Sequence, residues 1–379
     1  MRDLTARLRA IVRTPAAESA RELTYVPDLG MPVQSIDAGA VARQLDGEVR
    51  TRRGGSFVAI DRTWDAMDFH GKRRVGSYEI VPTAPLTLLD PRLAEVADWA
   101  SRIVFFDIET TGLSGGAGTI AFLVGCGWFE DGGFKVRQLL LTGPAGEPAL
   151  LEELGAIFDE ASLLVTYNGR TFDIPTMDTR WAFHRQQSAA EDLPHFDMLP
   201  PARRLWGRPA RMPASERLYE LPGDAGGCTL GALERLVLGF HRLGDVGGFE
   251  IPVRYFQFLR TGDPSVVEGV LEHNRHDLIS LAAVTSHALM LAADGPDACR
   301  DAGEQLALGR LYERAGDCAR AEHAFTLAGD GDDSEIAAHA SARLAALLRR
   351  ASRHDEAEQA WRRVIDAAGR RRSLAPLAR

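Results

Sequence analysis

Two acidic residues, Asp107 and Glu109, end an apolar segment of this 379-residue chain, Ile103–Glu109 (IVFFDIE), just before the turn-rich stretch TTGLSGG. Such a segment predicts a short β-strand, whose side chains alternate between two faces. Both carboxylates would then share a face with Phe105, and their like charges would repel one another. A divalent cation would offset this repulsion. The alternative is that both carboxylates are solvated at the strand end.

Residues of the same chemical kind occur in two later motifs. In LLVTYNGRTFDIP, Leu163–Pro175, Asp173 follows a predicted strand and a glycine turn, and its alternative role is to cap the next helix. In VLEHNRHDLISLAAV, Val270–Val284, His273 and Asp277 are four residues apart and therefore share one face of the predicted helix. By itself this pair also fits an ordinary surface contact.

Together, the three motifs resemble those of the DEDD (DnaQ-like) 3′–5′ exonuclease superfamily, which has the ribonuclease-H-like fold. FFDIETTGL resembles its first motif, YNGRTFDIP its second and HNRHD its third. The similarity is closer to the YprB-type bacterial branch, as indicated by HFDMLPPARRLW (195–206), CTLGALERLVLG (228–239) and EHNRHD (272–277). The resemblance implies a general base at His273 and four catalytic, metal-ligating acids: Asp107, Glu109, Asp173 and Asp277. We expect Thr110 and Asn168, from the first two motifs, to contact the substrate.

The third motif departs from the superfamily in its spacing. There the base is a histidine separated from the aspartate by four residues, or a tyrosine separated from it by three. Here three residues separate His273 from Asp277, so a histidine occupies the tyrosine position. The alternative base is His276, although on a helix it points about a quarter-turn away from Asp277.

The chemistry of phosphodiester hydrolysis accounts for these residue types. Two Mg²⁺ or Mn²⁺ ions, about 3.5–4 Å apart, can stabilise both the attacking and the leaving oxygen of an in-line displacement. Hard cations prefer carboxylate oxygens, and a histidine that titrates near neutrality can accept a proton from water. The expected cofactors are therefore two divalent cations.

An arginine-rich segment, PARRLWGRPARMPASER (201–217), contains five arginines and a single acid, Glu216. We predict that Arg203 and Arg204 contact the phosphates of a nucleic acid and that Trp206 stacks on a base. The alternative is a solvated loop with Trp206 packed inward.

Composition is that of a globular protein, with 45% hydrophobic and 26% charged residues and a net charge of −9. The four cysteines form no C-x-x-C pair, which favours reduced thiols over a disulfide or zinc framework. We find neither a membrane-length apolar run nor the apolar core of a signal peptide, so we expect a cytoplasmic protein without membrane contacts.

The predicted fold is α/β, a ribonuclease-H-like mixed β-sheet flanked by helices. The expected divisions are an irregular N-terminal region (1–97), the exonuclease domain (98–294) and a helical segment (300–379). The first region has a few short strand-like runs and ends in the expected linker PTAPLTLLDPR (82–92). Strands are predicted at 103–109, 121–129, 134–141, 163–168 and 195–198. Helices are predicted at 147–160, 174–186, 229–238, 252–260 and 264–293.

The C-terminal segment resembles tetratricopeptide repeats. The first copy has matching residues at Leu308, Gly309, Tyr312, Ala321, Phe325 and Ala328, and a weaker copy follows 36 residues later. These repeats either stabilise the nuclease domain or bind a protein partner. The arginines of the tail, 370–379, either touch nucleic acid or solubilise the end.

The predicted function is a metal-dependent nuclease that removes nucleotides from single-stranded 3′ ends of DNA or RNA. Two alternatives stay open. One is a non-catalytic scaffold that binds nucleic acid or protein, and the other is an endonuclease acting on hybrids or branched DNA.

Overall fold

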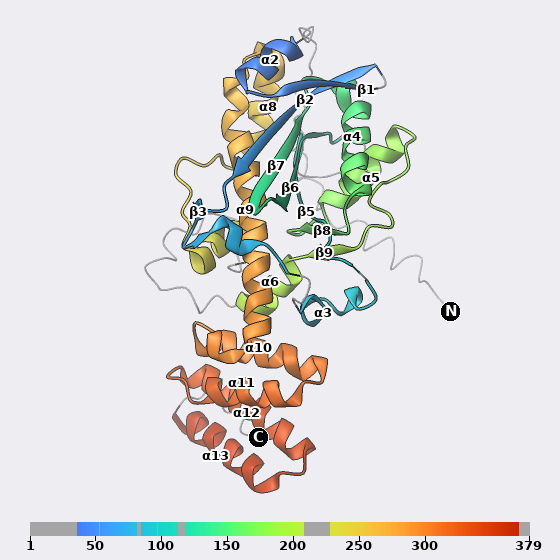
Figure 1. The fold of residues 1–379 in the computed structure, drawn as a ribbon. Coiled ribbons are helices and arrows are strands. Elements are labelled where there is room, and N and C mark those ends of the chain that lie inside the picture. Colours follow the sequence, from blue (N-terminus) through green and yellow to red (C-terminus); the bar gives the residue numbers. More distant parts are fainter. Residues whose placement is uncertain are drawn as a thin grey trace, which may run out of the picture. The chain divides into compact units, whose positions relative to one another are not determined.

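The computed structural model describes residues 36–52, 54–81, 85–96, 98–112, 118–207 and 228–370. A seven-stranded sheet lies at its centre, in the order β1-β2-β7-β6-β5-β8-β9 (Figure 1). β5 pairs antiparallel with β6 and parallel with β8, so the sheet is mixed. The strands are β1 (Glu48–Arg52), β2 (Gly55–Trp64), β5 (Ile103–Thr110), β6 (Ala121–Glu130), β7 (Gly133–Leu140), β8 (Leu163–Thr166) and β9 (His195–Asp197). A separate hairpin is formed by β3 (Phe69–His70) and β4 (Arg73–Arg74).

The five predicted strands are present, with ends that differ by a few residues. β8 stops at Thr166, two residues before the predicted end. Asn168 has φ 67°, in the left-handed region, so the chain turns there instead of continuing as a strand.

The sheet extends beyond the boundary predicted at residue 98. β2 pairs with β7 from Val58↔Leu140 to Trp64↔Phe134, and β1 pairs with β2 at the sheet edge. The expected linker also contributes to the core. Leu86 and Leu89 of the short helix α3 (Leu86–Leu89), together with Leu93, are buried in a hydrophobic cluster. The linker prediction was wrong because these leucines pack against the body of the protein.

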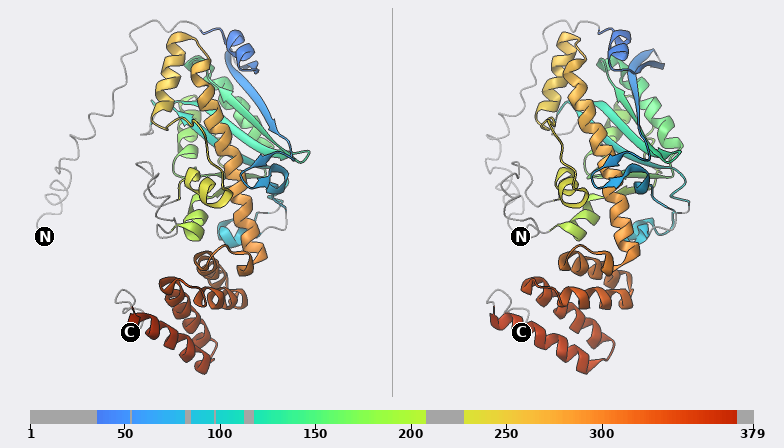
Figure 2. Two further views of the ribbon diagram at one scale, coloured as in Figure 1. Left: turned by 90° about the vertical axis from the view of Figure 1, so that its left-hand side faces the viewer. Right: turned by 60° about the vertical axis from the view of Figure 1, so that its left-hand side comes forward.

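Helices cover both faces of the sheet (Figures 1 and 2). α9 (Ser265–Asp294) packs against β5, β6 and β7, while α4 (Glu147–Asp159) packs against β1 and β2. On β5, Phe106 meets Phe158 of α4 with ring centroids 5.2 Å apart, whereas Phe105 contacts Phe134 in the other cluster. The alternation predicted for this strand therefore places its two acids on the α9 side. The remaining helices of this part are α2 (Ala38–Gln44), α5 (Asp173–Phe183), α6 (Leu199–Trp206), α7 (Leu230–Leu233) and α8 (Glu250–Thr261).

We predicted no apolar run of membrane length, but α9 is long and apolar enough by composition to cross a membrane. However, 72% of the apolar 18-residue stretch of this helix is buried inside the protein. We therefore interpret it as a core helix. It runs beside the sheet and ends next to the C-terminal helices.

Four further helices follow α9, namely α10 (Ala302–Ala315), α11 (Cys318–Gly329), α12 (Ser334–Arg350) and α13 (His354–Arg370). Each packs against the next one along the chain. Gly309 of α10 lets the helices come close, because a Cβ atom there would lie 2.6 Å from the Phe325 ring of α11. The predicted helical C-terminal segment is thus confirmed, whereas the tail 371–379 and residues 1–35 lie outside the described residues.

Candidate active site

The C-terminal end of β5 presents Asp107 and Glu109 toward α9. The pairing of β5 with β6 shifts its register between Glu109 and Thr110. Such an irregularity re-aims side chains, and it often occurs next to active sites. The hydroxyl of Thr110 is turned elsewhere, because it is buried and donates a hydrogen bond to the Gly112 carbonyl over 2.8 Å. Thr110 therefore holds the turn after the strand.

A buried amide fixes the orientation of Asp107. Nδ2 of Asn274, on α9, lies 2.8 Å from Oδ2 of Asp107. Oδ1 of Asn274 accepts a hydrogen bond of 2.8 Å from Nε2 of Gln138 on β7. Between these partners lies Gly125, which pairs with Asp107 on one side and with Gln138 on the other. A Cβ atom at Gly125 would lie 2.3 Å from Oδ1 of Asn274, so only glycine leaves room for this amide.

Asp173 is the first residue of α5, which follows the loop after β8. Its backbone lies inside the helix, and the N-cap position belongs to Phe172, so the alternative of Asp173 as an N-cap is not what the structure shows. Burial raises the pKa of its carboxyl to about 7, with backbone hydrogen bonds from Asp173 and Ile108 acting in the opposite direction. The charges of Asp197 and Asp277 add to the increase.

α9 brings His273 and Asp277 to the same place. Nε2 of His273 lies 3.3 Å from Oδ2 of Asp277 and 3.9 Å from Oε1 of Glu109. One potential ligand atom from each of these three residues lies within 4.8 Å of the other two. His276 points aside, where its Nε2 lies 3.1 Å from Oε1 of Glu272 and its ring contacts Phe240.

The pKa directions show that these acids form one electrostatic cluster. Burial raises the pKa of Asp107 well above its usual range, and the charges of Asp277, Glu109 and Asp173 raise it further. Burial and the charges of Asp277 and Asp173 do the same to the pKa of Glu109. The structure therefore brings together the four predicted acids, whose charges repel one another.

Two residues of one loop near the cluster, Arg242 and Asp245, were not anticipated from the sequence. Arg242 donates hydrogen bonds to Asp277 and to both carboxylate oxygens of Glu234. Oδ1 of Asp245 lies 2.7 Å from Nδ1 of His273. Arg242 and Asp245 belong to the loop HRLGDVGG, which carries no periodic pattern that would reveal their positions.

Asn274 was also missed, although a signal existed. It lies three residues after Leu271 and four before Leu278, so it interrupts an apolar helical stripe with an amide. A polar residue within such a stripe is buried and needs a hydrogen-bond partner. Its side chain is fully buried here and has two partners.

The predicted substrate residues occupy three different environments. Asn168 is exposed, its backbone N–H donates to Oδ1 of Asp197 over 2.8 Å, and its side chain accepts from Thr171. Arg203 and Arg204 lie on α6, where they line a cavity together with residues of the C-terminal helices. The other arginines of this segment, Arg208, Arg211 and Arg217, fall outside the described residues.

Trp206 corrects one prediction. Its side chain is only 1% exposed, and its Nε1 donates to Oε1 of Glu304 over 2.8 Å. A ring that is buried in this way cannot stack on a base, so the alternative of inward packing is the one that the structure shows.

Comparison with known proteins agrees with this architecture. Residues 104–289 match the model of the RNase_H superfamily. The chain is also similar to the uncharacterized protein YprB of Bacillus subtilis (strain 168), with 34% identity over 213 residues, which is 56% of this chain and 48% of the relative. The match therefore spans about half the length of that curated protein.

Proposed function

We propose that this chain, whose residues 104–289 form a ribonuclease-H-like domain, is a metal-dependent DEDD-type nuclease that removes nucleotides from 3′ ends. The observation that carries the proposal is the convergence of four acids from β5, α5 and α9. Burial and mutual repulsion raise the pKa of three of them, namely Asp107, Glu109 and Asp173. Buried carboxylates that repel one another lower the stability of a fold, and such clusters are typical of sites that bind a ligand.

The donor set fits divalent cations such as Mg²⁺ or Mn²⁺, because it consists of carboxylate oxygens. Asp107, Glu109, Asp173 and Asp277 would hold two ions, which supply a nucleophile at neutral pH and stabilise the charge on the phosphate. The Arg242 guanidinium forms an ion pair with Asp277. Asn274 presents Oδ2 of Asp107 in a fixed direction by donating to it.

His273 has the surroundings of a general base. Nδ1 of His273 contacts Asp245, so in the neutral form this nitrogen carries the proton. The lone pair of Nε2 is then directed toward Glu109 and Asp277. Nε2 can therefore take a proton from a water molecule located among the acids. His276 has no such position, because its Nε2 faces Glu272.

The helical segment after residue 300 has a separate proposed role. We infer that α10–α13 form two tetratricopeptide-like repeats, supported by the close contact between Gly309 and Phe325 at repeat positions. The proposed partners are nucleic acid at the nuclease domain and a protein at the repeats. We propose that the enzyme acts in the cytoplasm.

The decisive experiment uses end-labelled single-stranded, duplex and hybrid oligonucleotides with Mg²⁺, Mn²⁺ or EDTA. A ladder that shortens from the 3′ end supports the proposal, and Asp107→Asn should abolish it because the amide keeps the shape of the side chain but loses its charge. Internal cuts would instead indicate an endonuclease. Binding without cleavage in every metal would indicate a scaffold and overturn the proposal, as would wild-type cleavage by Asp107→Asn.

A further inference from the structure

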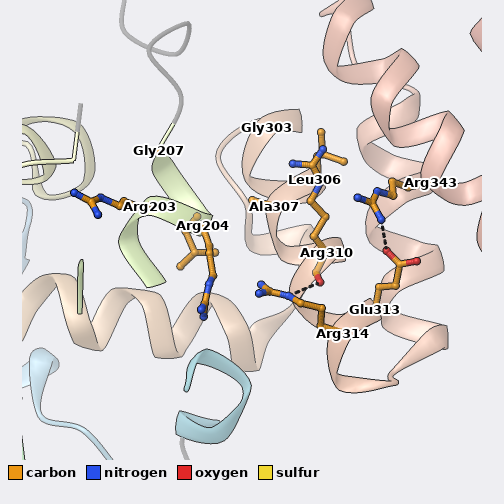
Figure 3. A pocket seen from close by; sticks show the side chains of 11 residues that line it. Arg203, Arg204, Gly207, Gly303, Leu306, Ala307, Arg310, Glu313, Arg314 and Arg343 are labelled. Carbon is orange, nitrogen blue, oxygen red and sulfur yellow. Dashed lines mark hydrogen bonds and ion pairs between the residues drawn. The ribbon is translucent and has the colours of Figure 1, made fainter. Parts of the chain in front are cut away.

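A cavity of about 390 Å³ lies between α6 of the nuclease domain and helices α10 and α12. Its charged lining consists of five arginines and one glutamate, namely Arg203, Arg204, Arg310, Arg314, Arg343 and Glu313. Figure 3 shows that Arg204 from α6 and Arg314 from α10 turn toward the same space. The cavity thus gathers positive charge on a chain whose net charge is −9.

A buried contact holds the two walls of this cavity together. Trp206, at the end of α6, donates to Glu304 of α10, and both side chains are buried. Arg300 also binds Glu304, so that carboxylate is already neutralised inside the protein. Because α6 and α10 are joined in this way, Arg203 and Arg204 have a fixed relation to the arginines of the helical segment.

The cavity has more cations than its acid can neutralise. Glu313 already pairs with Arg343, over 3.4 Å, and with Arg350. Within the part of the chain that the structure describes, no acid pairs with Arg203, Arg204 or Arg314. NH1 of Arg204 donates to the Leu89 carbonyl, a neutral acceptor, over 3.0 Å. Burial and the charge of Arg204 lower the pKa of Arg314, as expected for cations that face one another.

We propose that this cavity, which we name the arginine cavity, binds the phosphodiester backbone of a nucleic acid that extends beyond the active site. Guanidinium groups form forked hydrogen bonds with phosphate oxygens, and an anionic ligand would relieve the repulsion between Arg204 and Arg314. The inference rests on the proposed nuclease function and adds a second contact site, to which the helical segment contributes directly.

The position of the arginine cavity sets the length of nucleic acid that can reach it. Asp277 and Asp294 are both on α9, and a rise of about 1.5 Å per residue puts about 25 Å between them. α10 follows this end of α9. We therefore expect a strand held by its 3′ end at the acids to need several nucleotides to touch both sites, whereas a trinucleotide should reach only the acids.

Binding can be measured without cleavage in the Asp107→Asn background with EDTA. Fluorescence anisotropy of a labelled single strand of about 30 nucleotides, over a series of salt concentrations, compares Arg204→Gln/Arg314→Gln with Arg260→Gln/Arg349→Gln. The control removes the same charge, and Arg349 lies on another face of α12 than Arg343. We expect the first variant to weaken binding about tenfold and to reduce the slope of log K against log salt by about 1.4. We expect no such change in the control.

Three outcomes decide the matter. Equal effects of the two variants would overturn the inference, and they are the result expected if the arginine cavity binds an acidic protein instead. Restored binding in Arg204→Lys/Arg314→Lys would support a charge contact, and the single variants Arg204→Gln and Arg314→Gln serve if the double glutamine variant does not fold. Cleavage of a trinucleotide by the wild type tests the nuclease function separately, so the failure of one proposal does not hide the failure of the other.

Discussion

The amide of Asn274 donates to Oδ2 of Asp107 over 2.8 Å, and it does so from a fully buried position above Gly125. One end of this amide orients a predicted metal ligand, and the other accepts from Gln138. Side chains that orient metal ligands contribute strongly to metal affinity. Asn274 is therefore a positioning residue for the acidic cluster.

We predict that Asn274→Ala weakens Mn²⁺ binding about 10- to 100-fold and lowers the free energy of unfolding by about 1–3 kcal/mol, because the amide of Gln138 loses a partner. Calorimetric Mn²⁺ titration and urea unfolding measure the two effects. Thr285→Val is the control, since Thr285 is a buried polar residue of the same helix whose hydroxyl has no partner within the described structure. Unchanged Mn²⁺ affinity in Asn274→Ala would contradict the positioning role.

A second prediction concerns the stability of the metal-free protein. The pKa of Asp173 is about 7 in the folded state against an ordinary value of 3.8, and the pKa values of Asp107 and Glu109 are raised as well. Between these values the folded state binds more protons than the unfolded state, so stability must fall as pH rises. In EDTA we expect the melting temperature to decrease from about pH 4 to about pH 7, and Mn²⁺ to reverse the decrease by binding the folded state.

Matched variants separate this effect from general acid sensitivity. Asp173→Asn removes one of the raised pKa values, so in EDTA it should flatten the pH dependence and melt above the wild type at neutral pH. It should also lose much of the Mn²⁺ response. Asp332→Asn, at an exposed position, should behave as the wild type. A melting temperature that rises with pH in wild-type protein without metal would refute the electrostatic account.

Periodicity made part of this molecule predictable from its sequence. Alternation along IVFFDIE and helical spacing in EHNRHD placed the acids on faces that the structure brings together. Sequence could not place β1, because EVRTR is polar and joins the sheet only by pairing with β2. Nor could it place Arg242, because its contact with Asp277 of α9 joins residues that are 35 positions apart in the sequence. The prediction that Trp206 stacks on a base was wrong, since only tertiary contacts distinguish a buried ring from an exposed one.

A third prediction concerns the helical segment. Tyr312 of α10 is buried, and its hydroxyl donates to the Ala292 carbonyl of α9 over 2.9 Å. Leu308 and Leu311 lie in the same hydrophobic cluster as residues of α9. Removal of residues 300–379 should therefore expose this cluster and yield an aggregating protein, as size-exclusion chromatography would show. A soluble, monomeric truncation with normal thermal unfolding would mean that the segment is an independent appendage.

The point variant Trp206→Phe tests the same junction more gently. It keeps an aromatic ring but loses the hydrogen bond to Glu304, a charged acceptor, so we expect a loss of about 1.5–3 kcal/mol in the free energy of unfolding. Affinity for a trinucleotide should not change, because the ring is not a base-stacking surface. A loss of trinucleotide affinity at unchanged stability would restore the stacking role.

The fourth prediction identifies the general base. Nε2 of His273 faces the acids, whereas Nε2 of His276 faces Glu272. His273→Ala should lower the single-turnover rate by about 10²–10⁴-fold, the usual contribution of a general base, with little change in substrate affinity. His276→Ala should have a much smaller effect. His273→Tyr should keep part of the activity if tyrosine fits this spacing as in the related enzymes.

The pH dependence of the rate distinguishes a proton acceptor from a merely structural histidine. Burial lowers the pKa of His273, but the hydrogen bond to Asp245 and the charges of Asp277 and Asp245 outweigh it, so the net shift is upward. A base works when deprotonated, so the wild-type rate should rise with pH through this pKa. Asp245→Asn removes a group that raises the pKa, and it should move the rising limb to lower pH. If the rising limb of the pH–rate profile stays in place in Asp245→Asn, another group transfers the proton. The same conclusion follows if His276→Ala loses most of the turnover rate while His273→Ala keeps it.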